Sequence, residues 1–371
     1  MKWTFWLGVV SPHISEALRA LALMPDQTVI VVAEHALAEV RKSIGWNTPD
    51  CSPAHVLIEP KDAEIEQLIE KDCSKDTVHM IAIEKRGSLN RRVLPRLART
   101  GAMVGLMSET VDNRGILGTV RRVKYSLDRY SIEDKIDFLV VVGQVGVQWY
   151  KSVGYGPSHI FPLIYVTERP VPAADSDSAW KETEIFRVLY LGHFIRRKDG
   201  ITAIRALAGL RDCDWQFDAV GNGPDLGRWK RAANESGVAD RIRFHDAVNN
   251  RMIGNLFENT DLLLLPSRYD GWGAVVNEAL MCGVPVVCSD NCGAAELLRE
   301  PWRGATFKAG SAEDLRMVLR RWMERGKLTK QSRVRIREWS SAIEGAPLAR
   351  YFVEVVEFVR DGGVRPIPPW D

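Results

Sequence analysis

The residues best placed to do chemistry in this sequence are two acids that flank a glycine-rich turn. Asp270 is followed by Gly271-Trp272-Gly273, and Glu278 comes eight residues after Asp270. An apolar strand is expected at 262–265, so the turn falls at its carboxyl end, and a helix is expected from Ala274 onward. Glycine allows close approach to a ligand, and a helix N-terminus suits a phosphate. The two acids can therefore border one cleft, although a plainer interpretation leaves Glu278 as a cap or salt-bridge partner.

A second group with chemical potential is the run of cations Arg196, Arg197 and Lys198 after a strand predicted at 186–191. Fixed cations stabilise the negative charge that develops on a departing group. The alternative is an ordinary solvated basic loop. A third turn, Gly221-Asn222-Gly223-Pro224, follows a strand predicted at 215–220, and taken alone it is weak support for a binding site.

These groups must be positioned by a fold in which short apolar strands alternate with helices, which predicts parallel sheets covered on both faces. An aperiodic, proline-containing segment at 169–185 interrupts the alternation and predicts a linker. We predict an N-terminal domain over 1–168, a C-terminal domain over 186–345, and a final helix and tail over 346–371 that packs back towards the N-terminal domain. Strands in the first half are expected at 3–10, 28–33, 55–58, 78–83, 102–107 and 138–142.

The segment 261–294 resembles the signature of retaining glycosyltransferases of family 4, the glycosyl transferases group 1. That signature is an acid, a glycine–aromatic–glycine turn, Glu-Ala eight residues after the first acid, and Gly-x-Pro-Val. Here it reads Asp270, Gly271-Trp272-Gly273, Glu278-Ala279 and Gly283-Val284-Pro285-Val286. The first acid is Asp where Glu is commoner. The resemblance extends more loosely over 188–325 and implies the GT-B fold, an α/β architecture of two Rossmann-like domains whose parallel sheets face each other across a cleft.

The resemblance also implies roles for the matching residues. Glu278 would bind the ribose hydroxyls of a nucleotide-sugar donor, Asp270 would lie near the transferred sugar, and Lys198 would compensate the leaving diphosphate. His193 stands where the family has Arg, so Arg196, Arg197 or His193 itself would supply the missing contact. The predicted catalytic residues are Lys198 and Asp270, and the predicted donor-binding residues are His193, Arg196, Arg197, Gly221, Asn222, Val248, Gly271, Trp272, Gly273, Ala274, Val275 and Glu278.

Candidate acceptor residues lie in the N-terminal half, where the signals are weaker. His13 follows the first strand, and Ser108 and Glu109 follow the strand at 102–107, where many family members have a His. Glu109 either orients an acceptor hydroxyl or pairs with Arg114, which could itself contact the acceptor. His13 is either a substrate contact or a polar loop residue.

Composition limits the binding partners and the cellular compartment that the protein is expected to have. The chain has 50 basic and 48 acidic residues, a net charge of +2, which argues against a general nucleic-acid binder. Eleven basic residues and three acids fall between Lys85 and Arg129. They form either a solvated helical face or a patch for an anionic membrane or an acidic, lipid-linked acceptor. Scattered cysteines without a CxxC pair favour a reducing, cytoplasmic setting, and no apolar run approaches the roughly 20 residues that span a bilayer.

Together these features predict a cytoplasmic, metal-independent retaining glycosyltransferase that needs no cofactor. Its donor would be a nucleotide-sugar, with UDP-sugar favoured over GDP-sugar. Its acceptor would be a saccharide or lipid-linked saccharide, in bacterial surface polysaccharide synthesis. The basic segment is compatible with peripheral association of the protein with an anionic membrane. The alternative is a non-catalytic nucleotide-sugar-binding protein on the same fold. A nicotinamide-dependent oxidoreductase is disfavoured, because Ser11-Pro12-His13 stands where GxGxxG would follow the first strand.

Overall fold

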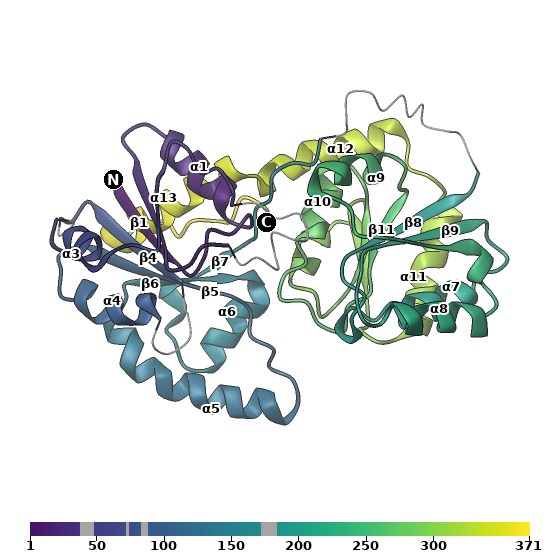
Figure 1. Ribbon diagram of the computed structural model, residues 1–371, viewed down its shortest axis with the longest axis horizontal. Coiled ribbons are helices and arrows are strands. Elements are labelled where there is room, and N and C mark those ends of the chain that lie inside the picture. Colours follow the sequence, from purple (N-terminus) through teal and green to yellow (C-terminus); the bar gives the residue numbers. More distant parts are fainter. Residues whose placement is uncertain (38–47, 72–73, 83–87, 172–183) are drawn as a thin grey trace. The chain divides into compact units, whose positions relative to one another are not determined.

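A computed structural model describes residues 1–37, 48–71, 74–82, 88–171 and 184–371. Most of the predicted linker, residues 172–183, lies outside the described residues, as do Cys73 and the start of the basic segment at Lys85. The chain divides into two compact units (Figure 1). The N-terminal unit is Met1–Glu168 together with Ala342–Asp371, and the C-terminal unit is Arg169–Ser341.

The N-terminal unit is built on a seven-stranded sheet in the order β3-β2-β1-β4-β5-β6-β7. Every pairing is parallel. Parallel strands covered on both faces need continuous apolar sequence, and β1 meets that need with fully buried Trp3, Phe5 and Trp6. The strands are β1 (Lys2–Leu7), β2 (Thr28–Ala33), β3 (His55–Ile58), β4 (Thr77–Ala82), β5 (Met103–Ser108), β6 (Phe138–Val142) and β7 (Ile160–Leu163).

Helices cover both faces of this sheet. On one face α1 packs against α13, so the C-terminal helix belongs to the N-terminal unit (Figure 1). On the other face α3, α4 and α6 close over one apolar core. The helices are α1 (Ser15–Leu23), α3 (Asp62–Lys71), α4 (Leu89–Leu97), α5 (Gly115–Ile132), α6 (Gly143–Ser152) and α13 (Gly345–Asp361).

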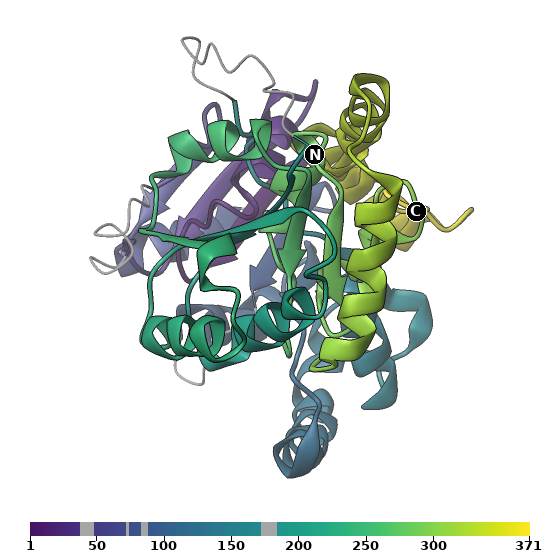
Figure 2. The ribbon, with the colours of Figure 1, turned by 90° about the vertical axis from the view of Figure 1, so that its right-hand side faces the viewer.

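The C-terminal unit has a six-stranded, all-parallel sheet in the order β10-β9-β8-β11-β12-β13. Helices α7, α8 and α11 lie on one face and α9, α10 and α12 on the other (Figures 1 and 2). The strands are β8 (Phe186–Leu191), β9 (Trp215–Val220), β10 (Ile242–His245), β11 (Leu262–Leu265), β12 (Val286–Ser289) and β13 (Gly304–Phe307). The helices are α7 (Gly200–Ala208), α8 (Leu226–Glu235), α9 (Ile253–Glu258), α10 (Val275–Met281), α11 (Ala312–Arg325) and α12 (Lys330–Ser340).

Both sheets therefore have the doubly wound order of a Rossmann-like fold, as the alternation of strands and helices predicts. In such sheets the strand order reverses at one point, and ligands bind outside the carboxyl ends of the two strands there. In the C-terminal unit that point lies between β8 and β11. Of the helices that the structure describes, none is both long and apolar enough to cross a membrane.

Candidate donor-sugar site

The loops after β8 and β11 bring Lys198 and Asp270 into contact at this reversal point. A short 3-10 turn, Arg196–Lys198, follows β8, and Asp270 closes the loop after β11. The Lys198 Nζ donates to Asp270 Oδ2 at 2.5 Å, with the two side chains only 14% and 11% exposed. Ser267 also donates to the same carboxylate oxygen, at 3.4 Å. The two residues predicted to be catalytic, 72 positions apart, thus form one partly buried ion pair.

The three consecutive cations separate into different environments. The Arg197 guanidinium lies 3.5 Å from Asp270 Oδ1 and donates to the Tyr269 carbonyl at 2.9 Å. Arg196 instead lines a hollow of about 170 Å³ beside α7 and α8. Of the two arginines proposed to replace the family's Arg, Arg197 is therefore the one that joins the Lys198–Asp270 pair.

A second set of contacts fixes the loop that carries these cations. The backbone N–H of Arg268 donates to the Arg197 carbonyl at 2.8 Å, and the Arg268 side chain donates to Asp199 at 2.9 Å. Asp199 is a non-glycine residue in the left-handed region, with φ 48°, and its carboxylate also accepts from Thr202 at 2.8 Å. Asp199 and Arg268 are positioning residues that composition and motif analysis did not single out.

The glycine turn after Asp270 is shaped by buried contacts. The Trp272 side chain is 1% exposed, and its indole N–H donates to Asn277 at 2.8 Å. Trp272 can therefore contact a bound nucleotide-sugar only through its backbone. Gly273 has φ 95°, and a Cβ there would meet Cys292 Sγ at 2.8 Å. A Cβ at Gly271 would meet nothing within 4 Å, so that position faces open space.

Glu278 lies in the first turn of α10, as the sequence predicts, and its side chain is half-buried. Desolvation by burial raises the pKa of its carboxyl from 4.5 to about 7. Among the described residues, none donates a hydrogen bond to this carboxyl. A desolvated carboxyl without a donor suits a ligand that brings hydroxyl donors of its own. Because α10 has only seven residues, its N-terminus is a weaker phosphate site than the sequence suggested.

The predicted donor residues His193, Gly221 and Asn222 lie where the loops after β8 and β9 meet, whereas Ala274 and Val275 begin α10. His193 Nδ1 donates to the Asn222 side-chain oxygen at 3.1 Å, which joins the loops after β8 and β9. Gly221, with φ 149°, is required here because a Cβ would lie 1.9 Å from the Gly192 carbonyl oxygen. With Nδ1 occupied, His193 can donate to a phosphate only through a protonated Nε2. Val248, in the loop after β10, is half-buried.

The predicted acceptor residues gather at the carboxyl edge of the N-terminal sheet. His13 stacks on Tyr165, with ring centroids 4.6 Å apart, and the Tyr165 hydroxyl donates to Glu109 at 2.5 Å. Ser108 bonds the buried Tyr150 hydroxyl at 2.7 Å. The sequence prediction missed both tyrosines.

Arg114 pairs with Asp112 rather than serving as the hydrogen-bond partner of Glu109, which accepts from Tyr165. The Arg114 Nε lies 2.8 Å from Asp112 Oδ1, just before α5 begins. The interpretation of Glu109 and Arg114 as a salt-bridged pair is thus replaced by two separate contacts.

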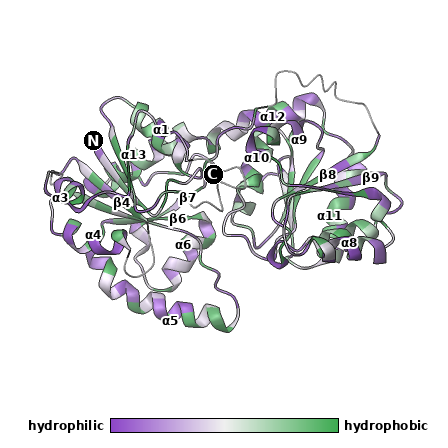
Figure 3. Cartoon of the chain, in the orientation of Figure 1, coloured by the Kyte–Doolittle hydropathy of each residue, from purple (hydrophilic) through white to green (hydrophobic). Residues whose placement is uncertain are grey.

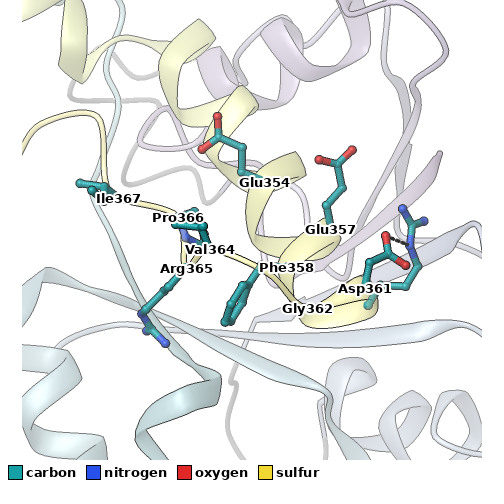
Figure 4. Close-up of a pocket in the computed structure, with 10 residues that line it drawn as sticks. Glu354, Glu357, Phe358, Asp361, Gly362, Val364, Arg365, Pro366 and Ile367 are labelled. Atoms are coloured by element: carbon teal, nitrogen blue, oxygen red, sulfur yellow. Dashed lines mark hydrogen bonds and ion pairs between the residues drawn. The ribbon is translucent and has the colours of Figure 1, made fainter.

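A hollow of about 610 Å³ lies elsewhere in the N-terminal unit, between α13 and the C-terminal tail (Figure 4). Glu354, Glu357 and Asp361 line it, and Arg365 turns its guanidinium to the Ser158 carbonyl at 3.0 Å. Arg360, which pairs with Asp361, also lines the hollow, so with Arg365 its charged side chains sum to −1 and offer a diphosphate no excess of positive charge. Among the residues described, no group of three or more His, Cys, Asp or Glu side chains could hold a metal ion.

Comparison with solved structures defines the class of fold. The chain aligns over 97% of its length, and 99% of the other chain, with a glycosyltransferase from Rickettsia africae ESF-5, at a TM-score of 0.70 and 14% identity. It aligns over 96% of its length, and 100% of the other chain, with Anabaena HepE in complex with UDP, at a TM-score of 0.68 and 14% identity. These similarities and the two parallel sheets show the GT-B fold.

Sequence comparison then identifies the family. Residues 174–339 match the model of glycosyl transferases group 1, so the chain carries a domain of that family, as the motif around Asp270 and Glu278 predicts. A 2-deoxystreptamine glucosyltransferase of Streptomyces kanamyceticus is 32% identical over 99 residues, 26% of each chain. A GDP-mannose-dependent alpha-(1-6)-phosphatidylinositol monomannoside mannosyltransferase of Mycolicibacterium smegmatis is 31% identical over 38% of this chain and 41% of its own. The chain thus matches less than half the length of these relatives.

Proposed function

We propose that this protein is a retaining glycosyltransferase that moves a hexose-type sugar from a nucleotide-sugar to a saccharide or lipid-linked acceptor. The observation that carries the proposal is the ion pair of Lys198 and Asp270 at the strand-order reversal of a group 1 domain, with Arg197 beside it and Glu278 eight residues further on. Anabaena HepE has been solved with UDP and with UDP-glucose, which favours a UDP-sugar donor here. In the proposed reaction no cofactor is needed.

The cations are suited to a departing diphosphate. Lys198 has three N–H donors and spends one on Asp270, so two remain for phosphate oxygens. Counting Lys198 and Arg197 as +2 and Asp270 as −1, the group carries a net charge of +1. Because the pair is already formed and partly buried, it stabilises the developing charge without reorganising.

Glu278 is suited to the nucleoside end of the donor. Ribose hydroxyls would donate to its carboxylate and replace the hydrogen bonds that burial removed. Hydrogen bonds to the charged form lower a carboxyl pKa, so binding would favour the ionised state.

The bond changes in the proposed reaction balance without a strong protein base. The bond between the sugar anomeric carbon and the diphosphate oxygen breaks, and a bond to an acceptor hydroxyl oxygen forms on the same face. The hydroxyl proton passes to the departing phosphate oxygen. We assign Glu109, held by Tyr165, and His13 to orientation of the acceptor in the N-terminal unit.

A nucleotide panel tests the donor site directly. UDP, GDP, ADP and their common sugar conjugates are added to wild type, Glu278→Gln and the matched control Glu324→Gln, whose carboxylate is exposed on α11. A ligand at 100 times its Kd stabilises the native state by about 2.7 kcal/mol. We expect one base to raise the Tm of wild type and Glu324→Gln, and to raise that of Glu278→Gln much less.

Release of the nucleoside diphosphate from the preferred sugar conjugate then measures turnover without knowledge of the acceptor. Slow release by wild type, and release at least about 100-fold slower by Lys198→Ala, supports catalysis at this site. Folded protein that responds to no nucleotide contradicts the proposal. Binding without release, including with a panel of glycan acceptors, establishes the non-catalytic alternative instead.

A further inference from the structure

A small hollow in the C-terminal unit is lined by more cations than acids. It has a volume of about 170 Å³ and lies at the first turns of α7 and α8. Four arginines and two aspartates line it, so four positive and two negative charges give a net charge of +2. They are Arg196, Arg205, Arg228, Arg268, Asp199 and Asp225. Lys198, Asp270 and Glu278 do not line it, so the hollow is separate from the candidate donor-sugar site.

Half of these arginines are already neutralised by a carboxylate. Arg268 Nε lies 2.9 Å from an oxygen of Asp199, and Arg228 Nη1 lies 3.2 Å from an oxygen of Asp225. Arg196 and Arg205 are exposed, and neither forms an ion pair within the part of the chain that the structure describes. The excess of two positive charges at the hollow therefore comes from two guanidinium groups that are available to a ligand.

The helices α7 and α8 add the positive ends of their dipoles to this charge. They lie side by side (Figure 1), and hydrophilic residues recur along α8 (Figure 3). Asp199 and Asp225 occupy the two N-cap positions, but neither side chain accepts a hydrogen bond from a backbone N–H of its helix. An anion in the hollow would thus face two uncapped helix N-termini as well as the arginines.

Packing beneath the hollow holds the two helices in place. Trp229 of α8 lines the hollow and is only 1% exposed. A Cβ on Gly200 of α7 would lie 2.3 Å from the Trp229 ring, so the helices touch closely there. The same ring packs on Tyr190 and Phe194, with centroids 5.0 and 4.8 Å away. The backbones that carry the arginines are therefore fixed, and binding an anion would need little reorganisation.

We propose that this hollow binds a phosphate dianion, held by Arg196, Arg205 and Arg228. Its volume is below the roughly 300 Å³ at which pockets for drug-sized ligands begin, so it suits a phosphate group rather than a whole nucleotide. The two negative charges match the net charge of the hollow, and guanidinium groups fit phosphate oxygens in a bidentate geometry. The proposal rests on the hollow alone, so it can succeed or fail independently of the proposed function.

Isothermal titration calorimetry of the full chain at pH 7.5, without nucleotide or acceptor, tests the proposal. Inorganic phosphate and glycerol 3-phosphate are the two probes, because free phosphate and a phosphate monoester share the chemistry that the hollow recognises. We expect saturable binding to one site, which weakens as NaCl is added and the charges are screened. The probe that binds more tightly identifies the source of the phosphate group, and either result supports the site.

Variants of Arg205 locate the binding site. Arg205→Gln removes an unpaired guanidinium, and we expect phosphate to bind at least about tenfold more weakly. Arg205→Lys keeps the charge without the bidentate geometry, so its loss should be smaller. The matched control is Arg231→Gln, which removes an exposed arginine of α8 that does not line the hollow, and it should bind as wild type does. Both positions are exposed, so each variant should keep the wild-type Tm.

Three results would overturn the proposal. The first is the absence of saturable phosphate binding by wild type at low salt. The second is an equal loss in Arg205→Gln and Arg231→Gln, which would show a diffuse effect of net charge. The third is loss of phosphate binding in Lys198→Ala with full binding in Arg205→Gln, which would assign the anion to the donor site. A protein that binds phosphate as expected but responds to no nucleotide would contradict the proposed function and support this site.

Discussion

The main structural role of Asp270 is its ion pairing with the cations of the loop after β8. Its carboxylate contacts Lys198 at 2.5 Å and Arg197 at 3.5 Å, so the shorter Asp side chain reaches the cations without the extra methylene of Glu. The family resemblance placed Asp270 near the transferred sugar, and that role stays a prediction. The contacts add a second role, since fixing the Lys198 ammonium lowers the cost of orienting it during the reaction.

Replacing Lys198 should affect chemistry far more than replacing a neighbouring cation. Lys198→Ala removes a charge aimed at the proposed diphosphate, and we expect kcat to fall by about 10²- to 10³-fold. It also leaves Asp270 with less compensation, which should cost about 1–3 kcal/mol of stability. The control is Arg205→Ala, in the exposed surface of α7. Steady-state kinetics and urea unfolding check both effects, and equal kcat values for the two variants would contradict the assignment.

Glu278 should make stability depend on pH in a defined window. Its folded pKa of about 7 lies above its unfolded value of 4.5, so between these pH values the folded chain binds the extra proton. Stability contributed by this group therefore falls as pH rises through the window, by at most about 3 kcal/mol. The loss should vanish in Glu278→Gln.

The measurement for Glu278 is the free energy of unfolding in urea at pH 5 and pH 7.5, for wild type and variant. The difference between the two proteins isolates Glu278 from the other titrating groups. A difference that stays constant across this range would show that the carboxyl is not desolvated in the free protein.

At the scale of elements, the loop between β11 and α10 depends on one glycine more than on its neighbour. Gly273→Ala forces a Cβ towards Cys292 and Leu265, 2.8 and 2.9 Å away, in a backbone with φ 95°. We expect a loss of about 1–3 kcal/mol of stability and weaker nucleotide binding. Gly271→Ala, two residues earlier, meets nothing within 4 Å and is the matched control for stability. Similar Tm values for the two variants would show that the turn is not held as described.

The sequence predicted most elements that position the site, because buried parallel strands are continuous apolar runs. The strands at 186–191, 215–220 and 262–265 were predicted with the bounds that the structure has. Strand β7 was missed because Pro162 interrupts a short edge strand. Helix α5 was predicted only as part of the solvated helical face that one interpretation gave to the basic segment, because its apolar side chains do not mark a core-facing side.

Side-chain pairing was harder to predict than the elements. The motif selected Lys198 and Asp270 separately, but the pairing of Arg197 with Asp270 depends on the local path of the loop after β8. Tyr165 was missed because no spacing rule links a residue after β7 to Glu109, 56 positions earlier. Which loops come into contact at the edge of a sheet depends on the order of its strands. That order cannot be read directly from a single sequence.

At the scale of the whole molecule, a net charge of +2 leaves little long-range attraction for anions, so positive charge acts where it is concentrated. One such concentration is the Lys198 and Arg197 pair in the C-terminal unit, which suits a diphosphate.

The location of the cations leads to a prediction about metals. If Lys198 and Arg197 compensate the departing diphosphate, nucleotide release should proceed at the same rate in excess EDTA as in Mg²⁺. Lys198→Ala lacks one of these charges, so added Mg²⁺ bound to the diphosphate should raise its activity while leaving wild type unchanged. Parallel assays of both proteins with EDTA, and with EDTA followed by excess Mg²⁺, measure this. Loss of wild-type activity in EDTA that Mg²⁺ restores would mean that the protein cations do not suffice, and that the diphosphate reaches this site as a metal complex.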